Sequence, residues 1–574
     1  MCAERFEREG THVGLTACFL YSVAYRRLVP EVSKQTVRAR IGIYRLRCAV
    51  HIDALRLSPS EYLQAIWWRL TGKKLRSRMR LAPILARSPL AYRLWQAERR
   101  GKTVPKFCSA VKDIELNAVV SLGEGMDQTV ASCRKEGLKA HAIADPKDLG
   151  ELGLPDNAWL VPLRAGDILA RGASARYRLA AASCEPECCV LYADDDVIDS
   201  AGDRSGPHLK PNWNSELFRH HDFVTGASML RGSALSVLSD PGSDWARSLT
   251  QAALDLCEEG GIDPVHVPHV LHHRQGRPSP NFAKSIVQTS HNWPSVTVVI
   301  PTRNRLDLLR TCLQGLQRTI YEGDLDILVV DNGSDEHKTL EYLAALNADF
   351  ARVLRDDGPF YFAALTNRAV RQASSELLCF LNNDIEIRDP NWLAPMVQQA
   401  LREDVGAVGA RLLYPNGLIQ HAGVVIGIGG AAAHAHRMIH PEEEGYFHRH
   451  ALPQFVSAVT AACLVVSCDK FNAVRGFDED IFAVSFNDVD LCLRLTQRGW
   501  RSVYEPRATL VHHESVSRGL DQKGAGAARQ AREVAALQTR WNTALAIPRD
   551  SLESADPFHH PGLSPLSERF VLRL

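Results

Sequence analysis

The chain of 574 residues is longer than one hydrophobic core ordinarily organises, so we expect two domains or more. Hydrophobic residues make up 45% and charged residues 23%, which is typical of a globular protein and excludes the disordered and fibrous classes. The net charge of +1 hides an uneven distribution. Residues 26–106 hold 20 Lys and Arg against four Asp and Glu, and the remainder is acidic on balance.

The lack of a long apolar run bears on the location of the protein. No stretch reaches the roughly 18 apolar residues that span a bilayer. Acidic and basic residues are mixed before the short apolar stretch at 13–23, unlike the plainly basic start of a secretory signal. The fourteen cysteines are scattered, without the paired framework of a secreted protein. We therefore expect a cytoplasmic protein.

Residues 1–110 are expected to form a basic, mainly helical region. Aromatic and aliphatic residues around Trp67 and Trp68 precede a run of cations from Lys73 to Arg80. An apolar stripe beside such a run can lie on an anionic surface, which predicts peripheral contact with the cytoplasmic face of the inner membrane. The alternative is a solvated helical face packed on the next domain, and both stay open. No recognised nucleic-acid-binding motif is present, so we expect no nucleic-acid partner.

Residues 295–520 alternate between strand and helix signals. Short β-branched runs indicate strands buried on both faces, and apolar residues spaced three and four apart indicate helices between them. This alternation predicts an α/β domain with a mainly parallel sheet flanked by helices. The expected strands are Val296–Pro301, Leu325–Val330 and Leu377–Leu381, and the expected helices are Leu306–Leu316, Thr339–Leu346, Phe362–Gln372 and Trp392–Leu401.

Polar residues follow each of the three expected strands. The first strand runs into PTRN at 301–304, the second into DNGSD at 331–335 and the third into NND at 382–384. Each segment alone is an ordinary turn sequence. Because such sheets bind ligands beyond the carboxyl ends of their strands, the three together predict a polar crevice.

Five ordered elements resemble the family 2 glycosyltransferases of the nucleotide-diphospho-sugar transferase (GT-A) fold. They are VTVVIPTRNR, LDILVVDNGSD, FLNNDIEI, FNDVDLCLRL and HHES, and they extend from Val296 to Gly519. More narrowly, the chain resembles bacterial rhamnosyltransferase-like enzymes of O-antigen and surface-polysaccharide assembly. The resemblance implies a catalytic domain at 295–520 and leaves the donor sugar, the nucleobase and the acceptor open.

The resemblance also assigns the residues that bind the nucleotide-sugar donor. A base and ribose pocket is expected near the sheet edge, where the carboxylate of Asp331 can accept a hydrogen bond from a base N–H. The donor-binding residues implied are Pro301, Thr302, Arg303, Asp331 and Asn383.

A divalent cation, Mn²⁺ or Mg²⁺, is a further implication of the resemblance. Asn382-Asn383-Asp384 is a variant of the family's Asp-x-Asp metal motif in which an amide replaces the first carboxylate, so Asp384 is the expected ligand. A later histidine of the family points to His512 or His513, with His513 slightly favoured. The cation would neutralise the diphosphate leaving group without proton transfer. A purely structural role for either histidine is the alternative.

Sugar transfer with inversion needs a base that takes the proton of the acceptor hydroxyl. The resemblance of Phe486-Asn487-Asp488-Val489-Asp490 to the family's acidic pair places the base at Asp488. Asp490 lies two residues further on, so on a helix it points elsewhere. Carboxylates at helix N-termini are also ordinary capping groups, which is the alternative role of Asp488.

Residues 111–285 are expected to be a diverged copy of the same fold, and residues 521–574 a C-terminal extension. The copy lacks a PTRN-like loop after its first strand at 116–121 and an acidic pair like that at 487–488. We therefore expect a degenerate GT-A-like domain, with a second active site on Asp194-Asp195-Asp196 as the alternative. The matched segments are CVLYADDDVID (189–199) with LCFLNNDIEI (378–387), FVTG (223–226) with FVSA (455–458), and PHVLHH (268–273) with PRATLVHH (506–513).

The implied function is inverting transfer of a sugar from a nucleotide-diphosphate donor to a glycan or lipid-linked acceptor in surface-polysaccharide biosynthesis. One rival is a nucleotidyltransferase on a similar sheet, which would show a glycine-rich loop where this chain has PTRNR. The other is a non-catalytic protein that binds sugars or nucleotides. Such a protein would tolerate the loss of base and metal ligand together, and here both are present.

Overall fold

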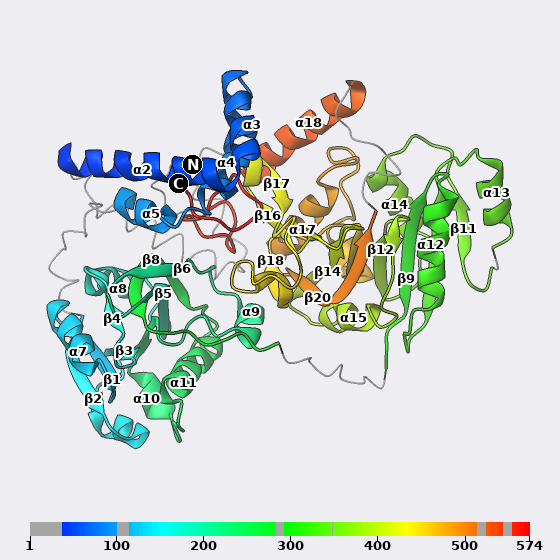
Figure 1. Cartoon of the computed structure of the whole chain (residues 1–574). Helices are drawn as coiled ribbons and strands as arrows, with labels where there is room; N and C mark the ends of the chain where they lie inside the picture. Colours follow the sequence, from blue (N-terminus) through cyan, green and yellow to red (C-terminus); the bar gives the residue numbers. More distant parts are fainter. Residues whose placement is uncertain (1–36, 100–113, 283–291, 347, 514–523, 544–553) are drawn as a thin grey trace, which may run out of the picture.

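The computed structural model describes residues 37–99, 114–282, 292–346, 348–513, 524–543 and 554–574. Figure 1 shows a group of N-terminal helices, a first α/β unit and a second, larger α/β unit. No helix within these ranges combines the length and the apolarity needed to cross a bilayer. The eleven cysteines in these ranges are all free thiols.

Four helices form the N-terminal part of the described chain. Pro59 lies at the start of α3, where its missing N–H removes no helical hydrogen bond. The buried side of the group is apolar, and Val50, Ala54, Ala65 and Leu81 are at most 6% exposed. The helices are α2 (Val37–Leu57), α3 (Pro59–Leu70), α4 (Lys74–Leu85) and α5 (Ala91–Arg99).

The first α/β unit is built on an eight-stranded sheet in the order β2-β1-β3-β7-β5-β8-β4, with β6 paired to β5. Its strands are β1 (Leu116–Ser121), β2 (Lys139–Ile143), β3 (Trp159–Leu163), β4 (Ile168–Leu169), β5 (Val190–Ile198), β6 (Arg204–His208), β7 (Ser228–Arg231) and β8 (Val265–Arg274). The helices that accompany them are α7 (Met126–Lys135), α8 (Ala173–Ala181), α9 (Ser215–His220), α10 (Ser233–Val237) and α11 (Trp245–Glu259).

The second unit contains a ten-stranded sheet in the order β11-β10-β9-β12-β19-β14-β20-β13, with β15 paired to β14 and β18 to β20. Alternate residues of its central strand face two separate cores. Val298 and Ile300 pack with Leu309 in one core, and Val299 packs with Phe380 in the other. A strand buried in this way reads as a continuous apolar run, which is the reason for the VTVVI sequence.

The strands of the second unit are β9 (Val296–Thr302), β10 (Leu325–Asp331), β11 (Arg352–Arg355), β12 (Leu377–Leu381), β13 (Ile385–Glu386), β14 (Val405–Leu413), β15 (Ile419–His421), β18 (Gln454–Val456), β19 (Cys463–Ser467) and β20 (Arg501–His512), and β16 (Val424–Ile426) pairs with β17 (Ala432–His434). Its helices are α12 (Leu306–Gln317), α13 (His337–Ala344), α14 (Phe362–Val370), α15 (Leu393–Ala400), α16 (Cys468–Ala473), α17 (Asn487–Gln497) and α18 (Gly524–Trp541).

The predicted fold class is confirmed. All seven expected elements of the second unit are present, and β12 has the predicted bounds, whereas α14 ends at Val370 rather than at Gln372. Two tandem α/β units follow a helical region, as the sequence indicates.

The two sheets are diverged copies of one topology. The strands β1-β3-β7-β5-β8-β4 and β9-β12-β19-β14-β20-β13 follow the same order. In both, the successive pairs are parallel, antiparallel, antiparallel, parallel and antiparallel. The copy predicted from the sequence is therefore present in the fold.

One predicted correspondence between the copies is wrong. Asp194-Asp195-Asp196 lies on β5, whose equivalent in the second unit is β14. Asn382-Asn383-Asp384 instead follows β12, whose equivalent in the first unit is β3, the strand that leads to Asp167. The two sequences match because any buried strand that runs into a polar turn has this pattern.

A buried polar contact joins the two units. Asn214 of the first unit donates to the carbonyl of Phe455 at 2.9 Å and accepts from its N–H at 3.1 Å. Beside it, Glu216 accepts from Arg402 at 2.6 Å and from Gln399 at 3.2 Å. Helix α9 is thereby held against β18 and α15 of the second unit.

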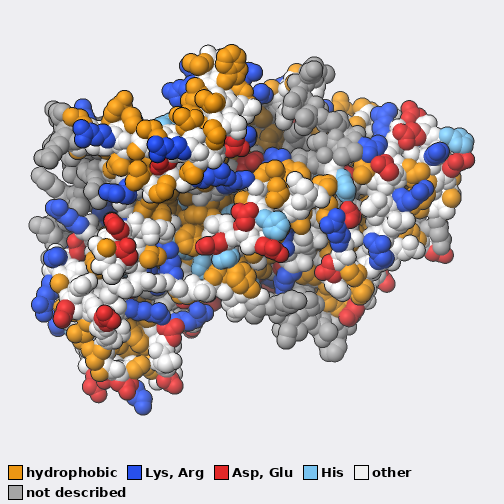
Figure 2. All heavy atoms as spheres, viewed as in Figure 1, with side chains coloured by type: hydrophobic (Ala, Val, Ile, Leu, Met, Phe, Trp, Pro, Cys, Tyr) orange, Lys and Arg blue, Asp and Glu red, His pale blue; other side chains and the backbone are white. Residues whose placement is uncertain are grey.

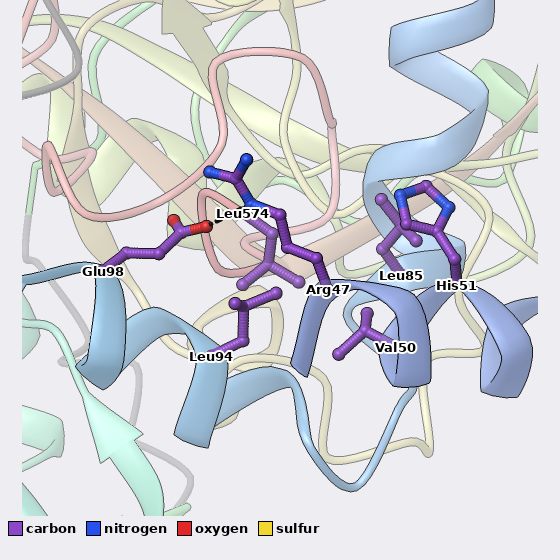
Figure 3. A pocket seen from close by; sticks show the side chains of 7 residues that line it. All are labelled: Arg47, Val50, His51, Leu85, Leu94, Glu98 and Leu574. Carbon is purple, nitrogen blue, oxygen red and sulfur yellow. Dashed lines mark hydrogen bonds and ion pairs between the residues drawn. The ribbon is translucent and has the colours of Figure 1, made fainter. Parts of the chain in front are cut away.

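The C-terminal segment, residues 554–574, packs where all the parts meet. Leu563 and Phe570 share a small core with Tyr92 of α5 and Val425 of the second unit. Trp95 of α5 also donates to the Gly562 carbonyl at 3.1 Å. Figure 3 shows Leu574 beside the ion pair of Arg47 and Glu98, with Leu94 below the pair. The closest atoms of Arg47 and Glu98 are 2.9 Å apart.

Replacing Glu216 should weaken the contact between the units in a pH-dependent way. Burial raises the pKa of Glu216, but hydrogen bonds from His220 and the charge of Arg402 lower it by more, so the pKa falls to about 2. A lowered pKa stabilises the folded state above the unfolded value of about 4.5, and this stabilisation disappears as the pH falls towards 2. Urea unfolding of Glu216→Gln should show a loss of up to about 3 kcal/mol at pH 7. The control is Glu442→Gln, which changes an exposed carboxylate and should leave the midpoint of urea unfolding unchanged.

Candidate functional site

The loop after β9 forms one wall of the candidate site. Asn304 and Arg305 both have positive φ, 53° and 51°, so the chain turns sharply where the strand ends. The Asn304 side chain explains how this turn is held. Its Oδ1 accepts from the N–H groups of Asp335 and Glu336 at 3.0 and 3.1 Å, which ties the loop after β9 to the loop after β10.

The three polar strand ends do lie together, as the sequence predicts. Asn383 donates to the Thr302 hydroxyl at 2.9 Å, across the ends of β12 and β9. The N–H of Asn332 donates to the Thr302 carbonyl at 2.8 Å. Thr302 is 4% exposed and Asn383 is 7% exposed, so they form the floor of the site. Pro301 is partly exposed at the end of β9, and Arg303 is exposed beside it.

Asp331 lies at the site, but its carboxylate is already engaged. One oxygen accepts from the Ser334 N–H at 3.0 Å, and the other forms an ion pair with Arg355 on the edge strand β11. Arg355 is 42% exposed, and its guanidinium also donates to the Ser334 carbonyl at 2.9 Å and to Asp357 at 2.7 Å. A base N–H that binds Asp331 has to displace this arginine, which the sequence did not indicate.

Asp384 and His512 face each other at the centre of the site. The imidazole Nε2 lies 3.1 Å from Asp384 Oδ1 and 3.4 Å from the Asn382 amide nitrogen. The other ring nitrogen, Nδ1, lies 2.7 Å from Oε1 of Gln420. Since an amide oxygen only accepts, Nδ1 carries a proton, and Nε2 is the ring nitrogen that faces Asp384, as an N–H donor in the imidazolium or as a lone pair in the neutral ring. Two acceptors this close repel unless a proton or a cation lies between them.

His513 turns away from this pair. Its Nε2 lies 3.1 Å from Glu386, whose other oxygen accepts from Arg388 at 2.8 Å. His513 is more exposed than its neighbour, because β20 ends at His512. The geometry therefore brings His512, and not the slightly favoured His513, to Asp384.

Asp488 lies at the start of α17 and is held by two backbone groups. The Ala461 N–H donates to Oδ2 at 3.0 Å and the Val489 N–H to Oδ1 at 2.9 Å. The next residue of that loop, Ala462, accepts from the Asn382 N–H at 3.0 Å, which connects Asp488 to the NND segment. Burial raises the pKa of Asp488 more than these hydrogen bonds lower it.

Asp490 serves a different purpose, as its position on the helix predicts. It is fully buried and accepts from Arg494 at 2.7 Å, four residues further along α17. Arg540 and Trp541 of α18 donate to its other oxygen at 2.8 and 3.0 Å. Asp490 therefore anchors the helix that carries Asp488.

Sequence reasoning missed two residues that shape this site. Gln420 lies on β15, outside every polar strand end, and only the pairing of β15 with β14 brings it to His512. Asn304 lies within the PTRNR segment, and its position in a turn was a usable signal, but its bridging role depends on the loop after β10.

The first unit has an altered version of this centre. Ile385 of β13 lies opposite His512, and the equivalent Ile168 of β4 lies opposite His273. Asp167 and His273 are thus the counterparts of Asp384 and His512. However, His273 binds Asp196 at 2.6 Å, and Asp167 accepts from the Gln275 N–H at 3.0 Å. The acid and the histidine of the first unit do not face each other.

The Asp194-Asp195-Asp196 triplet is buried and neutralised by the protein itself. Burial alone would raise the pKa of Asp195, but Lys210, Arg277 and Arg274 outweigh it and lower that pKa. Lys210 is also fully buried, with its ammonium 2.9 Å from Asp195. The side chains around the three acids are His266 and His560 at Asp194, Lys210, Arg274 and Arg277 at Asp195, and Tyr92, Arg204 and His273 at Asp196.

Asp194, His266 and His560 offer ligand atoms within 4.8 Å of one another, which raises the question of a metal centre. The Nδ1 of His560 accepts the Gly562 N–H at 2.8 Å, so its proton lies on Nε2, the atom 2.9 Å from Asp194. A metal-ligating histidine usually donates through its second nitrogen instead. The group is therefore a link between β5 and the C-terminal segment, in which His560 pairs with the Asp194 carboxylate.

Comparison with known proteins agrees with this geometry. Residues 297–449 match the family model described as glycosyl transferase family 2, which agrees with the resemblance of the five elements to that family. The match begins within β9, ends at Arg449 before β18, and includes the NND segment and Gln420.

Three relatives illustrate the similarity. Protein y4gI of Sinorhizobium fredii is 35% identical over 67% of this chain and 46% of its own length. The O-antigen biosynthesis protein RfbC of Myxococcus xanthus is 34% identical over 62% of this chain and 31% of its own length. The N-acetylglucosaminyl-diphospho-decaprenol L-rhamnosyltransferase of Mycobacterium tuberculosis is 44% identical over 12% of this chain and 21% of its own length. The chain thus spans less than half the length of each of these relatives.

Lys210→Met should destabilise the first unit strongly. The substitution roughly keeps the volume of the side chain but removes the fully buried ammonium that lies 2.9 Å from Asp195 Oδ2. Breaking a buried ion pair from one side costs roughly 3–5 kcal/mol, which thermal and urea unfolding would report. Lys147→Met, at an exposed position, is the matched control. If both variants unfold alike, the buried pair does not stabilise the fold.

Proposed function

We propose that residues 295–520 form the catalytic domain of an inverting glycosyltransferase. The enzyme moves a sugar from a nucleotide-diphosphate donor to a glycan or lipid-linked acceptor in surface-polysaccharide biosynthesis. The contact between Asp384 and His512, 3.1 Å apart at the edge of a family 2 domain, is the observation that supports this best. The similarity to an O-antigen biosynthesis protein supports the polysaccharide role.

Asp384 and His512 are the residues that would hold a divalent cation, Mn²⁺ or Mg²⁺. They fit because the carboxylate oxygen and Nε2 face each other, and because Gln420 holds a proton on the far nitrogen. The amide of Asn382, in place of a carboxylate, lowers the charge of the set. A cation bound there would supply Lewis-acid neutralisation of the charge that grows on the departing diphosphate.

The donor nucleotide is assigned to the strand ends beside this pair. Pro301, Thr302 and Asn383 form the floor under the nucleoside, and the exposed guanidinium of Arg303 is available to a phosphate. Asp331 accepts a base N–H once Arg355 rotates away.

Asp488 is assigned as the general base of the transfer. Its carboxylate takes the proton of the acceptor hydroxyl as the oxygen attacks the anomeric carbon from the face opposite the diphosphate. Two backbone N–H groups orient the carboxylate, and its raised pKa makes it a better proton acceptor than an ordinary aspartate. Asp490 and its contacts to α18 keep the base in place.

The first unit is assigned a structural and acceptor-holding role without transfer activity. Its counterpart of the metal-binding pair, Asp167 and His273, is separated, and its three consecutive acids are saturated by buried cations. The three acids are thus engaged by protein side chains, and Asp167, which keeps one oxygen without a hydrogen-bond partner among the described residues, does not have the histidine beside it. The second-active-site alternative therefore has less support.

We also assign the enzyme to the cytoplasmic face of the inner membrane, as a peripheral protein without a bilayer-spanning helix in its described ranges. A lipid-linked acceptor would be presented there, next to the sugar nucleotides of the cytoplasm. The basic N-terminal region supports this location.

Asp488→Asn tests the transfer reaction itself. Loss of a general base should lower kcat about a thousandfold and leave the binding of the sugar nucleotide intact. In the wild type the acidic limb of kcat/KM should lie above the pKa of an ordinary aspartate, because the base must be deprotonated and its pKa is raised. The readouts are nucleoside diphosphate release and calorimetric donor binding.

Asp490→Asn serves as the contrasting variant, because it removes a buried anchor two residues away. It should lower the melting temperature more than Asp488→Asn does and affect kcat per folded molecule less. Undiminished turnover in Asp488→Asn would contradict the assignment of the base, and loss of donor binding in that variant would point to a structural role.

Three variants test the metal-binding pair. His512→Ala should abolish Mn²⁺ binding, whereas His513→Ala should change it little, because His513 contacts Glu386 instead. Gln420→Leu should weaken Mn²⁺ binding about 10–100-fold, since the proton of His512 is no longer held on Nδ1. Paramagnetic resonance titration of free Mn²⁺, with a nucleoside diphosphate present, measures this without turnover. Equal binding in the two histidine variants would contradict the role of His512.

A further inference from the structure

The N-terminal helices expose an unusual amount of apolar surface. On α2, five residues spaced three and four apart form one exposed stripe, and on α3 three more form a second. The most exposed are Leu70 at 77%, Tyr44 at 68% and Trp67 at 64%. The stripes are Ile41, Tyr44, Cys48, Ile52 and Leu55 on α2, and Leu63, Trp67 and Leu70 on α3. Together we name them the helical apolar face.

Cations surround this face, and the acids near it are already used. Every Lys and Arg between residues 39 and 80 is exposed. Asp53 accepts from Ser88 at 2.7 Å, and Glu61 pairs with Arg80 at 3.3 Å. Figure 2 shows orange side chains gathered over α3 and along α2, with blue side chains between them. The cations are Arg40, Arg45, Arg47, Arg56, Arg69, Lys73, Lys74, Arg76, Arg78 and Arg80.

The same helices have a second, properly buried side, so the exposed stripes are not a consequence of poor packing. Val50 and Ala54 of α2, Ala65 of α3 and Ile84 of α4 are at most 2% exposed. A soluble surface helix shows one apolar stripe, and it faces the core. Here α2 and α3 each present a further apolar stripe outwards, which indicates a partner for that side.

We propose that the helical apolar face docks onto the surface of an anionic lipid bilayer, with the apolar stripes in the acyl boundary and the surrounding cations at the headgroups. Charge selects this occupant, because ten exposed cations against the three acids Asp53, Glu61 and Glu98 match an anionic surface and would repel a second copy of the same face. Exposed Leu and Trp beside Arg and Lys is the composition of an interfacial helix. The proposal rests on the proposed location at the membrane and adds the surface by which the protein would bind there. It does not depend on the transferase assignment.

Vesicle flotation of the full chain tests this directly. The wild type should float with phosphatidylcholine vesicles containing a quarter phosphatidylglycerol, and neither with pure phosphatidylcholine vesicles nor at high salt. Leu63→Gln/Trp67→Gln/Leu70→Gln should lower the partition at least about tenfold. Lys73→Gln/Lys74→Gln/Arg76→Gln should lower it about a hundredfold, from about 1 kcal/mol per charge.

A matched control separates this face from general stickiness. Leu122→Gln/Val237→Gln/Ile320→Gln removes three apolar side chains that are 54–58% exposed on the two α/β units, and it should float as the wild type does. Circular dichroism should show the same helix content in all variants. Nucleoside diphosphate release with a water-soluble acceptor should be unchanged, so a failure of docking stays distinguishable from a failure of the transferase assignment.

Cys48 offers a local reporter, because it is exposed and lies within the stripe of α2. With Cys2, Cys18 and Cys108 replaced by Ser, an environment-sensitive dye on Cys48 should shift to the blue on anionic vesicles. The proposal is overturned if the wild type does not float, or if the Leu63/Trp67/Leu70 variant floats equally. It is also overturned if that variant only converts a dimer into a monomer in light scattering. Flotation that appears only after deletion of residues 1–36 would likewise overturn it, since the chain would then cover the face itself.

Discussion

The arrangement of the whole chain depends on three buried carboxylates, Asp194, Asp195 and Asp196. Buried charges are costly unless they are paired and hydrogen-bonded. The first unit supplies all the cations around Asp195, whereas Asp194 and Asp196 also take partners from outside it. Tyr92 comes from the N-terminal helices and His560 from the C-terminal segment. The electrostatic requirement of one strand thus fixes two distant segments of the chain against the first unit, and the small core around Phe570 closes over them.

The two α/β units show how one topology can be kept while its chemistry changes. In the second unit the acid and the histidine at the sheet edge face each other, and Gln420 holds the imidazole from behind. In the first unit the histidine of the same register binds Asp196 on the neighbouring strand. The acids of β5 therefore engage the histidine of the first unit in a buried network of charges. In the second unit, the equivalent histidine stays beside Asp384 at the sheet edge.

The site of the second unit is built from short loops that hold one another. Asn304 joins the loops after β9 and β10, Asn383 joins β12 to β9, and the loop at Ala461 and Ala462 joins Asp488 to the NND segment. Such mutual support fixes side chains to the small tolerances that transfer chemistry requires. The helical apolar face lies on a separate part of the chain, so contact with a surface and chemistry can be altered independently.

By itself, the sequence determined the α/β alternation, the strands β9, β10 and β12, and the polar strand ends at Thr302, Asp331 and Asn383. These follow from local periodicity and from the rule that parallel strands place their carboxyl ends on one edge. Only the tertiary structure shows which of the side chains of His512 and His513 faces Asp384, because β20 pairs with β13 up to His512 and His513 lies beyond the end of the strand. Gln420 and the separation of Asp167 from His273 also depend on strand pairing. The partners of Asp194 lie 72 and 366 positions away in the chain, so the role of that carboxylate could not be read from its neighbours in sequence.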